Sequence, residues 1–384
     1  MNFERVPEHE ILRDSVREFF ARELPEERIR EMDRARRIPR DMWKRFAKLG
    51  WSGLSVPTEH GGSGADVSTG AVLCEELARR FPSLATDWLL ISMTARVLRE
   101  SGTAKQKAEL LPRLAQGDFL MSFGMSEPGG GTDVLALKTR ASLQGSEWVV
   151  RGQKLFTSFA DDADAILVLC RTDAAETKRS RGLSLVLTPR NQPGVQVRRL
   201  ELMGQRAACT CEVFLDDARA PADAVVGEQG RGWQTLLRTL DEERILCAAM
   251  YVGITAAALD QALQYAKDRT AFSRPIGAYQ AVQHPLAETA IELEQIRLLT
   301  AKAAWLQSHG HDCALEAAMA KHAATETALR ATDRGMRVLG GYGLVEASPM
   351  ERLFRDARLG PFSPISNEMV RNFVGERLGL PRSY

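Results

Sequence analysis

The sequence predicts an α+β protein in which helical N-terminal and C-terminal parts flank a middle β domain. Three observations support this prediction. Apolar residues recur at helical spacing before about residue 118, short apolar runs bounded by turn residues occupy the middle, and long segments almost free of helix breakers follow. We therefore predict three domains, over residues 1–118, 119–226 and 227–384.

The N-terminal part contains apolar stripes with the three- and four-residue spacing of amphipathic helices. One stripe consists of Ile11, Val16, Phe19 and Phe20, and another of Trp43, Phe46 and Leu49. Further helices are expected near residues 72–80 and 89–99, before a break at Gly117-Asp118.

The middle part has the pattern of an antiparallel β structure. Its short apolar runs cover residues 148–150, 165–169, 183–187 and 211–215. Turn residues such as Gln144-Gly145 and Asp216-Asp217 separate them. Many short strands with this punctuation predict a β-barrel or a β-sandwich.

The C-terminal part is expected to be a helical bundle. Residues 233–268 contain few helix breakers apart from Gly253, and two more long helical segments cover 283–309 and 315–339. The order of the chain is therefore helical, then β, then helical.

Composition excludes several classes of partner. The chain has 51 Lys and Arg against 50 Asp and Glu, so no global basic field attracts nucleic acid or an anionic membrane surface. No run of about twenty apolar residues is expected to cross a bilayer. The six cysteines form no C-x-x-C pair, which favours a cytoplasmic location and no metal site. His309, His311 and Cys313 lack a fourth ligand and are interpreted as a polar turn.

The segment 124–133, GMSEPGGGTD, is the most informative motif. Three consecutive glycines permit unusual backbone conformations and close approach of a ligand to the backbone. Free N–H groups, together with the hydroxyls of Ser126 and Thr132, could bind a flavin edge or phosphate oxygens. The alternative is a simple connection between strands, and no G-x-G-x-x-G fingerprint of a dinucleotide fold is present.

Two further motifs lie in the C-terminal part. Arg269 stands at an expected helix end before a Pro-Ile-Gly turn, which suits pyrophosphate binding, although a cation that caps the helix is the ordinary alternative. Gly340 and Gly341 end another expected helix and bring backbone close to a neighbour, although a plain helix stop would look similar.

Together and in this order, the motifs resemble the acyl-CoA dehydrogenase family over nearly the whole chain. The matching stretches are GMSEPGGGTD, VVRGQKLFTS, DRTAFSRPIGAYQ, VLGGYG and ERLFRDAR. The resemblance implies a C-terminal four-helix bundle and an FAD cofactor that is bound partly across the subunit interface of a homodimer or homotetramer. It also implies an acyl-CoA substrate and transfer of electrons to an electron-transfer flavoprotein.

The resemblance carries individual roles onto this sequence. Thr132 is expected to contact both the flavin and the acyl-CoA, and Asp241 and Arg244 are expected to contact the substrate. Arg337 replaces the usual glutamine, and Phe156 to Ser158 replace the usual Trp-Ile-Thr. The residues expected to bind FAD are Phe123, Met125, Ser126, Gly131, Thr132, Phe156, Thr157, Ser158, Arg269, Gln280, Arg337, Gly340, Gly341, Ser366 and Glu368.

One position departs from the family pattern. Many members carry the catalytic glutamate in a Tyr-Glu-Gly-Thr segment shortly after Arg-Asp-Ala-Lys, whereas ungapped alignment here places Pro364 at that position. Proline offers no base, so another carboxylate must take the proton or the reaction must differ.

Glu243 is the predicted replacement for the missing base. It falls on an apolar helical stripe between Leu240 and Cys247, where burial would raise its pKa toward the range a base needs. An ion pair with Arg244 or Lys267 is the structural alternative, and the neighbouring Glu242 is expected to be solvated. The segment resembles the helix of isovaleryl-CoA dehydrogenase that carries the base. The competing Glu368 follows Ser366, a predicted N-cap, and is explained by the helix dipole.

The predicted activity is therefore FAD-dependent α,β-dehydrogenation of an acyl-CoA thioester. Three alternatives remain open at this point. The acyl group could be carried by an acyl carrier protein, the same fold could perform other flavin chemistry, or the chain could be a non-catalytic partner subunit.

Overall fold

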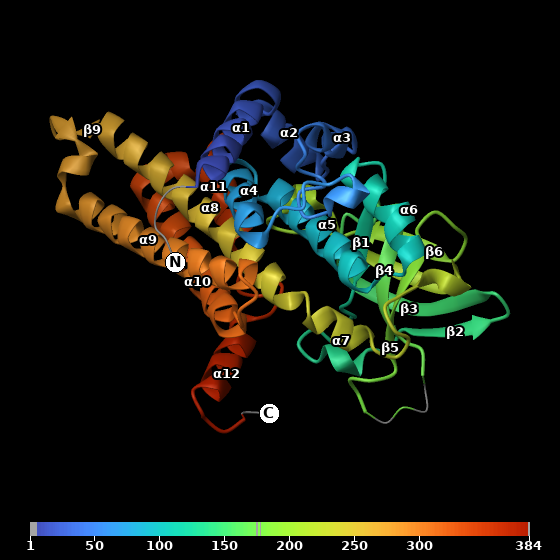
Figure 1. The fold of residues 1–384 in the computed structure, drawn as a ribbon. Coiled ribbons are helices and arrows are strands. Elements are labelled where there is room, and N and C mark those ends of the chain that lie inside the picture. Colours follow the sequence, from blue (N-terminus) through green and yellow to red (C-terminus); the bar gives the residue numbers. More distant parts are fainter. Residues whose placement is uncertain (1–5, 174–175, 177, 383–384) are drawn as a thin grey trace.

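The computed structural model describes residues 6–173, 176 and 178–382, and these form three parts (Figure 1). A curled β sheet lies at one end of the molecule and a bundle of long helices at the other. The N-terminal helices lie across the junction between the two. The order helical, β, helical that the sequence predicts is thus the order of the structure.

The N-terminal part is entirely helical. A 3-10 turn, η1 (Thr58–His60), lies in the loop between its third and fourth helices. The helices expected near 72–80 and 89–99 lie inside α4 and α5. The six helices are α1 (Pro7–Glu23), α2 (Glu26–Ala35), α3 (Asp41–Lys48), α4 (Val67–Arg80), α5 (Pro82–Ser101) and α6 (Ala104–Ala115).

Strands β1 to β8 of the middle part join one sheet. Its order is β6-β7-β3-β2-β4-β5-β8, and β1 joins beside β4 in parallel. The sheet curls so that β5 approaches β7 across an apolar interior, as expected for a barrel-like domain. The strands are β1 (Met121–Gly124), β2 (Arg140–Gln144), β3 (Glu147–Ser158), β4 (Ala165–Arg171), β5 (Leu183–Pro189), β6 (Val195–Arg199), β7 (Thr210–Pro221) and β8 (Val225–Val226).

The C-terminal part is the expected bundle. Helices α8 (Leu240–Asp268), α9 (Gln280–Ser308) and α10 (Ala314–Leu339) pack on one another, and the shorter α11 (Pro349–Ala357) packs against both α8 and α10. A small hairpin of β9 (Thr270–Ala271) and β10 (Arg274–Pro275) connects α8 to α9. Helix α12 (Asn367–Arg377) packs on α10.

One expected helix is interrupted. The segment 233–268 divides into α7 (Gly232–Leu237) and α8, with the break at Arg238 and Thr239. The hydroxyl of Thr239 donates to the carbonyl oxygen of Leu236 over 2.8 Å, and the backbone N–H of Thr239 donates to the same oxygen. Threonine thereby offers the backbone a local alternative to the helix, so α7 ends and α8 begins at the next residue.

Helices α5 and α8 link the parts into one molecule. One apolar core contains residues from both the N-terminal helices and the C-terminal bundle. A second core joins the later residues of α5, such as Ala95 and Leu98, to strands of the sheet. Helix α5 is buried on nearly all sides, and its buried residues include polar ones such as Thr86 and Asp87 beside the apolar majority.

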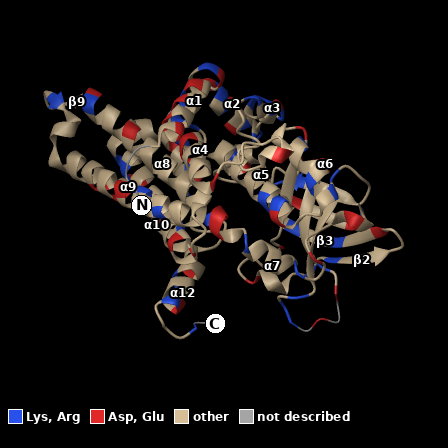
Figure 2. Ribbon diagram, in the orientation of Figure 1, with Lys and Arg blue, Asp and Glu red and all other residues tan. Residues whose placement is uncertain are grey.

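Helix α8 is long and apolar enough to span a bilayer by length and composition, contrary to the expectation that no such run exists. Its most apolar window has a mean hydropathy of 1.5, and 89% of that window is buried inside the protein. Its apolarity is therefore that of a core helix. Charged residues of both signs are interspersed over the other elements (Figure 2), in line with the near-zero net charge.

The close crossing of α4 and α8 depends on Gly253. A β-carbon at this position would lie 2.2 Å from the carbonyl oxygen of Glu75 and 3.0 Å from the β-carbon of Ala78. We predict that Gly253→Ala lowers the free energy of unfolding by about 1–3 kcal/mol, because the two helices must move apart.

Gly375→Ala on α12 is the matched control. A β-carbon there meets only the side chain of Leu380, at 3.6 Å, so alanine should be neutral or stabilise by up to ~1 kcal/mol. Urea unfolding of both variants checks the prediction, and equal stabilities would contradict it.

Candidate active site

The glycine-rich loop after β1 is anchored from beneath by a buried ion pair. Lys154 of β3 is fully buried, and its Nζ donates to Glu127 Oε1 over 2.9 Å and to the carbonyl oxygen of Met125 over 3.1 Å. The Glu127 carboxylate also accepts from the backbone N–H groups of Lys138 and Thr139. Partial burial acts to raise the pKa of Glu127, but Lys154 and these hydrogen bonds hold it below its usual value. The loop is therefore fixed at its centre.

This loop and the end of β3 lie side by side, so the two predicted flavin-contacting segments come together. The N–H of Leu155 donates to the carbonyl oxygen of Ser126 over 2.9 Å. The hydroxyl of Ser122 donates to the carbonyl oxygen of Ser158 over 2.7 Å. Phe123 and Met125 lie on the same part of the chain, at and just after β1. The backbones of the two predicted segments are thus adjacent, while Phe123 and Met125 pack against the second apolar core.

The end of β3 and the glycine-rich loop present an exposed aromatic ring and open backbone. Phe156 sits in a β-bulge at φ 58°, and its side chain is 61% exposed. A bulky residue in the left-handed region is strained and marks a functional position. β-Carbons at Gly129 and Gly131 would meet nothing within 4 Å, so backbone there is open to a ligand. The hydroxyl of Thr157 is buried without a hydrogen-bond partner among the described residues.

Glu243 stands in the first turn of α8 as a half-buried carboxylate. The expected alternative of an ion pair with Arg244 is wrong, because Arg244 instead donates to Asp241 over 2.9 Å. No ion pair of Glu243 occurs within the part of the chain that the structure describes. Burial raises the pKa of Glu243 to about 7, and the nearby charge of Arg244 only partly offsets this. Glu243 is thus poised between its two protonation states at neutral pH.

The expectation that Glu242 is solvated is wrong. Its carboxylate is buried and forms an ion pair with Arg96 of α5. The position faces the neighbouring helix because residue 242 lies 100° around α8 from Glu243. Glu242 therefore joins the N-terminal helices to the bundle.

The C-terminal segment that carries the base in many relatives lies next to Glu243. Cys247, one turn after Glu243 on the same face of α8, is 3.8 Å through its Sγ from the carbonyl oxygen of Ser363. Pro364 follows directly. The segment is also held by Lys321 of α10, whose Nζ donates to the carbonyl oxygen of Ile365 over 2.5 Å.

Ser366 and Glu368 have the roles that helix capping predicts. The Ser366 hydroxyl accepts from the N–H of Met369, which caps α12. The Glu368 side chain is 70% exposed and pairs with Arg371 over 2.8 Å. Of the two candidate carboxylates, only Glu243 is both half-buried and without an ion pair among the described residues.

The second predicted group of FAD-binding residues lies at the other end of α8. Arg269, Gly340 and Gly341 line a pocket of about 460 Å³, together with Tyr265, Ile276, Val338, Leu339, Tyr342 and Val345. Gly340 has φ 59°, and β-carbons on either glycine would meet nothing within 4 Å. Two distant motifs thus build one open cradle. Gln280 begins α9 nearby, whereas Arg337 is exposed and pairs with Asp333.

Several site residues were not expected from the sequence. Lys154 and Lys321 are both fully buried and support the two site segments from beneath. A signal for Lys321 existed, because it falls on the inward-facing stripe of α10 between Ala317 and Ala324. His309, at the C-terminal end of α9, stacks on Trp305 with ring centroids 4.3 Å apart.

The raised pKa of Glu243 makes a prediction about stability. At a pH below 4.5, the usual pKa of a glutamate, the carboxyl is protonated in both the folded and unfolded states, so it does not change the free energy of unfolding. Between about pH 4.5 and pH 7 the unfolded state ionises while the folded state stays protonated, so stability falls over this range and levels off above about pH 7. Glu243→Gln should therefore unfold at the wild-type free energy at pH 4.5 and be more stable by up to ~3 kcal/mol at pH 8.

The quantity to measure is the difference in unfolding free energy between Glu243→Gln and the wild type. Thermal unfolding of both proteins at the same FAD saturation gives it. Burial also raises the pKa of Asp356 to about 7, and subtraction removes its contribution. A constant difference across this pH range would show that Glu243 is not perturbed.

Comparisons with known proteins agree with the geometry. Three family models match, described as the acyl-CoA dehydrogenase N-terminal domain over residues 6–118, the middle domain over 122–218 and the C-terminal domain over 230–379. The chain is 39% identical to acyl-CoA dehydrogenase FadE12 of Mycobacterium tuberculosis over 358 residues, which is 92% of each protein.

Solved structures are similar over their whole length. The acyl-CoA dehydrogenase of Geobacillus kaustophilus matches with a TM-score of 0.95 and 31% identity, and 99% of this chain and 100% of that chain are covered. The prolyl acyl carrier protein oxidase AnaB matches with a TM-score of 0.92 and 26% identity, and 98% and 100% are covered. The chain belongs to the acyl-CoA dehydrogenase family of FAD-dependent oxidoreductases, which act on CH–CH groups.

Proposed function

We propose that this protein dehydrogenates an acyl-CoA thioester between its α and β carbons with Glu243 as the catalytic base. The observation that carries the proposal is the state of the two candidate carboxylates. Glu243 is half-buried, unpaired among the described residues and adjacent to the segment of Pro364, whereas Glu368 is exposed and paired. A base of pKa about 7 is matched to proton abstraction near neutral pH.

Substrate binding is assigned to residues around the first turn of α8. Thr132, from the glycine-rich loop, and the paired Asp241 and Arg244 hold the thioester so that its α-carbon faces Glu243. The Glu243 carboxylate takes the α-proton as the C–H bond breaks. Bound FAD supplies the acceptor for the β-hydride, so the two electrons of that C–H bond leave the substrate as the double bond forms.

Two features of the fold tune the base. The apolar surroundings disfavour the ionised form of Glu243 and make it basic, as its raised pKa records. The N-terminus of α8 carries partial positive charge and limits this effect, so the carboxylate still ionises near neutral pH. Phe156 offers a ring to cover one face of the flavin.

The full FAD site is proposed to need a second copy of the chain. Glu243 and Arg269 lie at opposite ends of α8, roughly 40 Å apart at about 1.5 Å of rise per residue, which is longer than an extended dinucleotide. Phe272, beside the pocket of Arg269, is 93% exposed, and Tyr342 and Leu344 are exposed as well. An apolar surface of this kind marks a protein interface, here that of a homodimer or homotetramer.

An electron-transfer flavoprotein is proposed as the electron acceptor, on the basis of family membership. A cytoplasmic location stays a prediction.

The second candidate function is oxidation of an acyl group on a carrier protein, and the similarity to a prolyl acyl carrier protein oxidase favours it. Comparison of turnover of matched CoA and carrier-protein thioesters distinguishes the two.

The assignment of the base predicts the behaviour of two isosteric variants. Glu243→Gln should retain FAD and bind thioester, but reduction of the flavin by substrate should slow by ~10² or more, because the proton acceptor is removed. Glu368→Gln is the matched control and should react at the wild-type rate. Anaerobic stopped-flow loss of flavin absorbance measures both. If the Glu368 variant is the slow one, Glu243 is not the base.

The split cofactor site predicts that Arg269→Ala weakens FAD binding. Loss of one charge-assisted contact corresponds to about 1.5–3 kcal/mol of binding free energy. Lys267→Ala removes an exposed charge two residues away and should leave FAD affinity unchanged. Dilution experiments that follow flavin release, combined with light scattering, test the site. A flavin-loaded monomer would contradict the shared site.

A further inference from the structure

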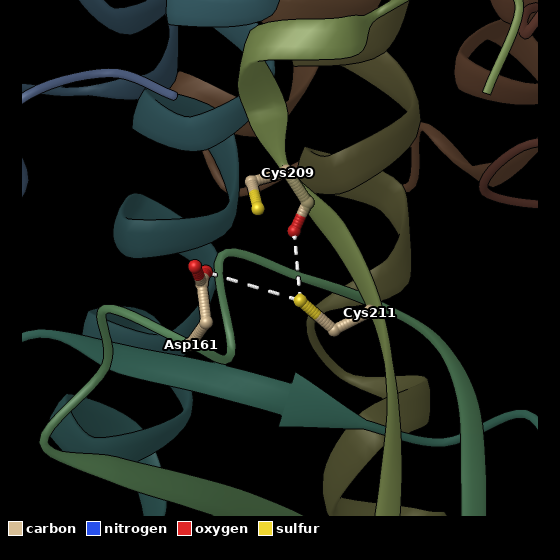
Figure 3. A group of neighbouring side chains, drawn as sticks. All are labelled: Asp161, Cys209 and Cys211. Atoms are coloured by element: carbon tan, nitrogen blue, oxygen red, sulfur yellow. Dashed lines mark hydrogen bonds between the residues drawn. The ribbon is translucent and has the colours of Figure 1, made fainter. Parts of the chain in front are cut away.

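Two thiols and a carboxylate converge in the middle domain, away from Glu243. The sulfur atoms of Cys209 and Cys211 and a carboxylate oxygen of Asp161 all lie within 4.8 Å of one another. Figure 3 shows the three side chains directed toward one another from two segments of the chain. Cys211 is fully buried and Cys209 is 5% exposed.

The backbone is shaped to present these ligands. Cys209 adopts φ 46° between the 3-10 turn η3 (Arg206–Ala208) and β7, so the two cysteines do not follow a regular strand. Its carbonyl oxygen accepts from the N–H of Phe159, which fixes the turn that carries Asp161. A left-handed non-glycine residue stores strain and is retained where the surroundings require it.

A further carboxyl group is buried in the neighbouring helix. Asp87 of α5 is 2% exposed, and its Oδ1 has no hydrogen-bond partner among the described residues. Its helix packs against η3, which leads directly into Cys209. A buried carboxylate oxygen without a hydrogen-bond partner is costly, so a cation bound beside it would stabilise this region.

We propose that Asp161, Cys209 and Cys211 bind a thiophilic divalent metal ion, with Zn²⁺ as the closest chemical match, and that Asp87, which lies outside the 4.8 Å cluster, turns toward the metal as the fourth ligand. A tetrahedral site with bonds of about 2.0–2.3 Å has ligand atoms about 3.5–3.8 Å apart. Cys211 Sγ lies 3.8 Å from Asp161 Oδ1, so small side-chain rotations complete the site.

The surroundings supply charge balance and outer hydrogen bonds. Arg199 donates to Asp161 Oδ2 over 2.6 Å, and Asp161 Oδ1, which accepts from the Cys211 thiol, is the oxygen that would ligate the metal once that thiol is deprotonated. Arg37 pairs with the adjacent Asp162. Binding forms two metal–sulfur and two metal–oxygen bonds and releases the protons of both thiols and of Asp87 to solvent. No oxidant or reductant is required.

The metal site would be structural and separate from the chemistry at Glu243. It joins α5, the turn after β3 and the start of β7. Thr157, beside Phe156 on β3, pairs in register with Cys211. A metal here would therefore stabilise the flavin-facing end of β3 against the N-terminal helices.

The test uses the reduced, FAD-loaded enzyme. Metal is removed with chelator, the protein is equilibrated with Zn²⁺, and bound zinc is measured by elemental analysis. The variants are Cys211→Ser, Asp161→Asn and Asp87→Asn, with Cys170→Ser as the matched control, because Cys170 is buried in the same domain and contacts Ser184. Alkylation mapped by mass spectrometry reports which thiols zinc protects, and FAD content reports folding.

We expect about one zinc per chain, selective protection of Cys209 and Cys211, and a rise in melting temperature with zinc. Cys211→Ser and Asp161→Asn should weaken binding at least ~10-fold, and the Cys170 variant should bind normally. If Cys211→Ser fails to fold, Asp161→Asn, which keeps both thiols, still tests whether the cluster binds zinc. Lack of zinc uptake, equal protection of all cysteines, or a Cys209–Cys211 disulfide that forms while the reduced protein binds no zinc would overturn the proposal.

Discussion

The architecture depends on the burial of α8 along nearly its whole length. This helix is apolar on all sides, so it is stable only when other elements surround it. Helices α4 and α5 cover it from the N-terminal part, and α9, α10 and α11 cover it from the bundle. Gly253 shows how close this packing is, because no β-carbon fits between α8 and the backbone at Glu75. The N-terminal and C-terminal parts therefore share one core.

The same constraint perturbs the proposed base. A carboxylate placed in the first turn of a buried helix is desolvated, which opposes folding above neutral pH and raises the pKa of Glu243 to about 7. The segment of Pro364 packs near this region. Lys321 and Cys247 contact its backbone carbonyl oxygens, at Ile365 and at Ser363. The segment is therefore held against both α8 and α10.

The length of α8 also separates the two predicted parts of the FAD site. Strand β3, which carries Phe156, belongs to the sheet at one end of the molecule, whereas the hairpin that follows Arg269 lies at the other end (Figure 1). The two predicted parts of the site are therefore apart within one chain, which is the basis for proposing that a neighbouring copy completes it. The exposed Phe272 at the hairpin beyond α8 is consistent with this arrangement.

The sequence alone determined the order of the three parts, the glycine-rich loop, the capping role of Ser366 and the candidacy of Glu243, because each depends on local periodicity, turn chemistry or a motif read along the chain. Only the tertiary structure decided which charges are paired. Glu242 turned out to be buried against Arg96, and Arg244 was taken by Asp241, since partners on other helices and small rotations about the helix axis are invisible in one dimension. The break before α8 and the burial of Lys154 and Lys321 were likewise decided by the tertiary structure. The cluster of Asp161, Cys209 and Cys211 was not expected from the sequence, because Asp161 is distant in the chain from the two cysteines and meets them only when β3 pairs with β7.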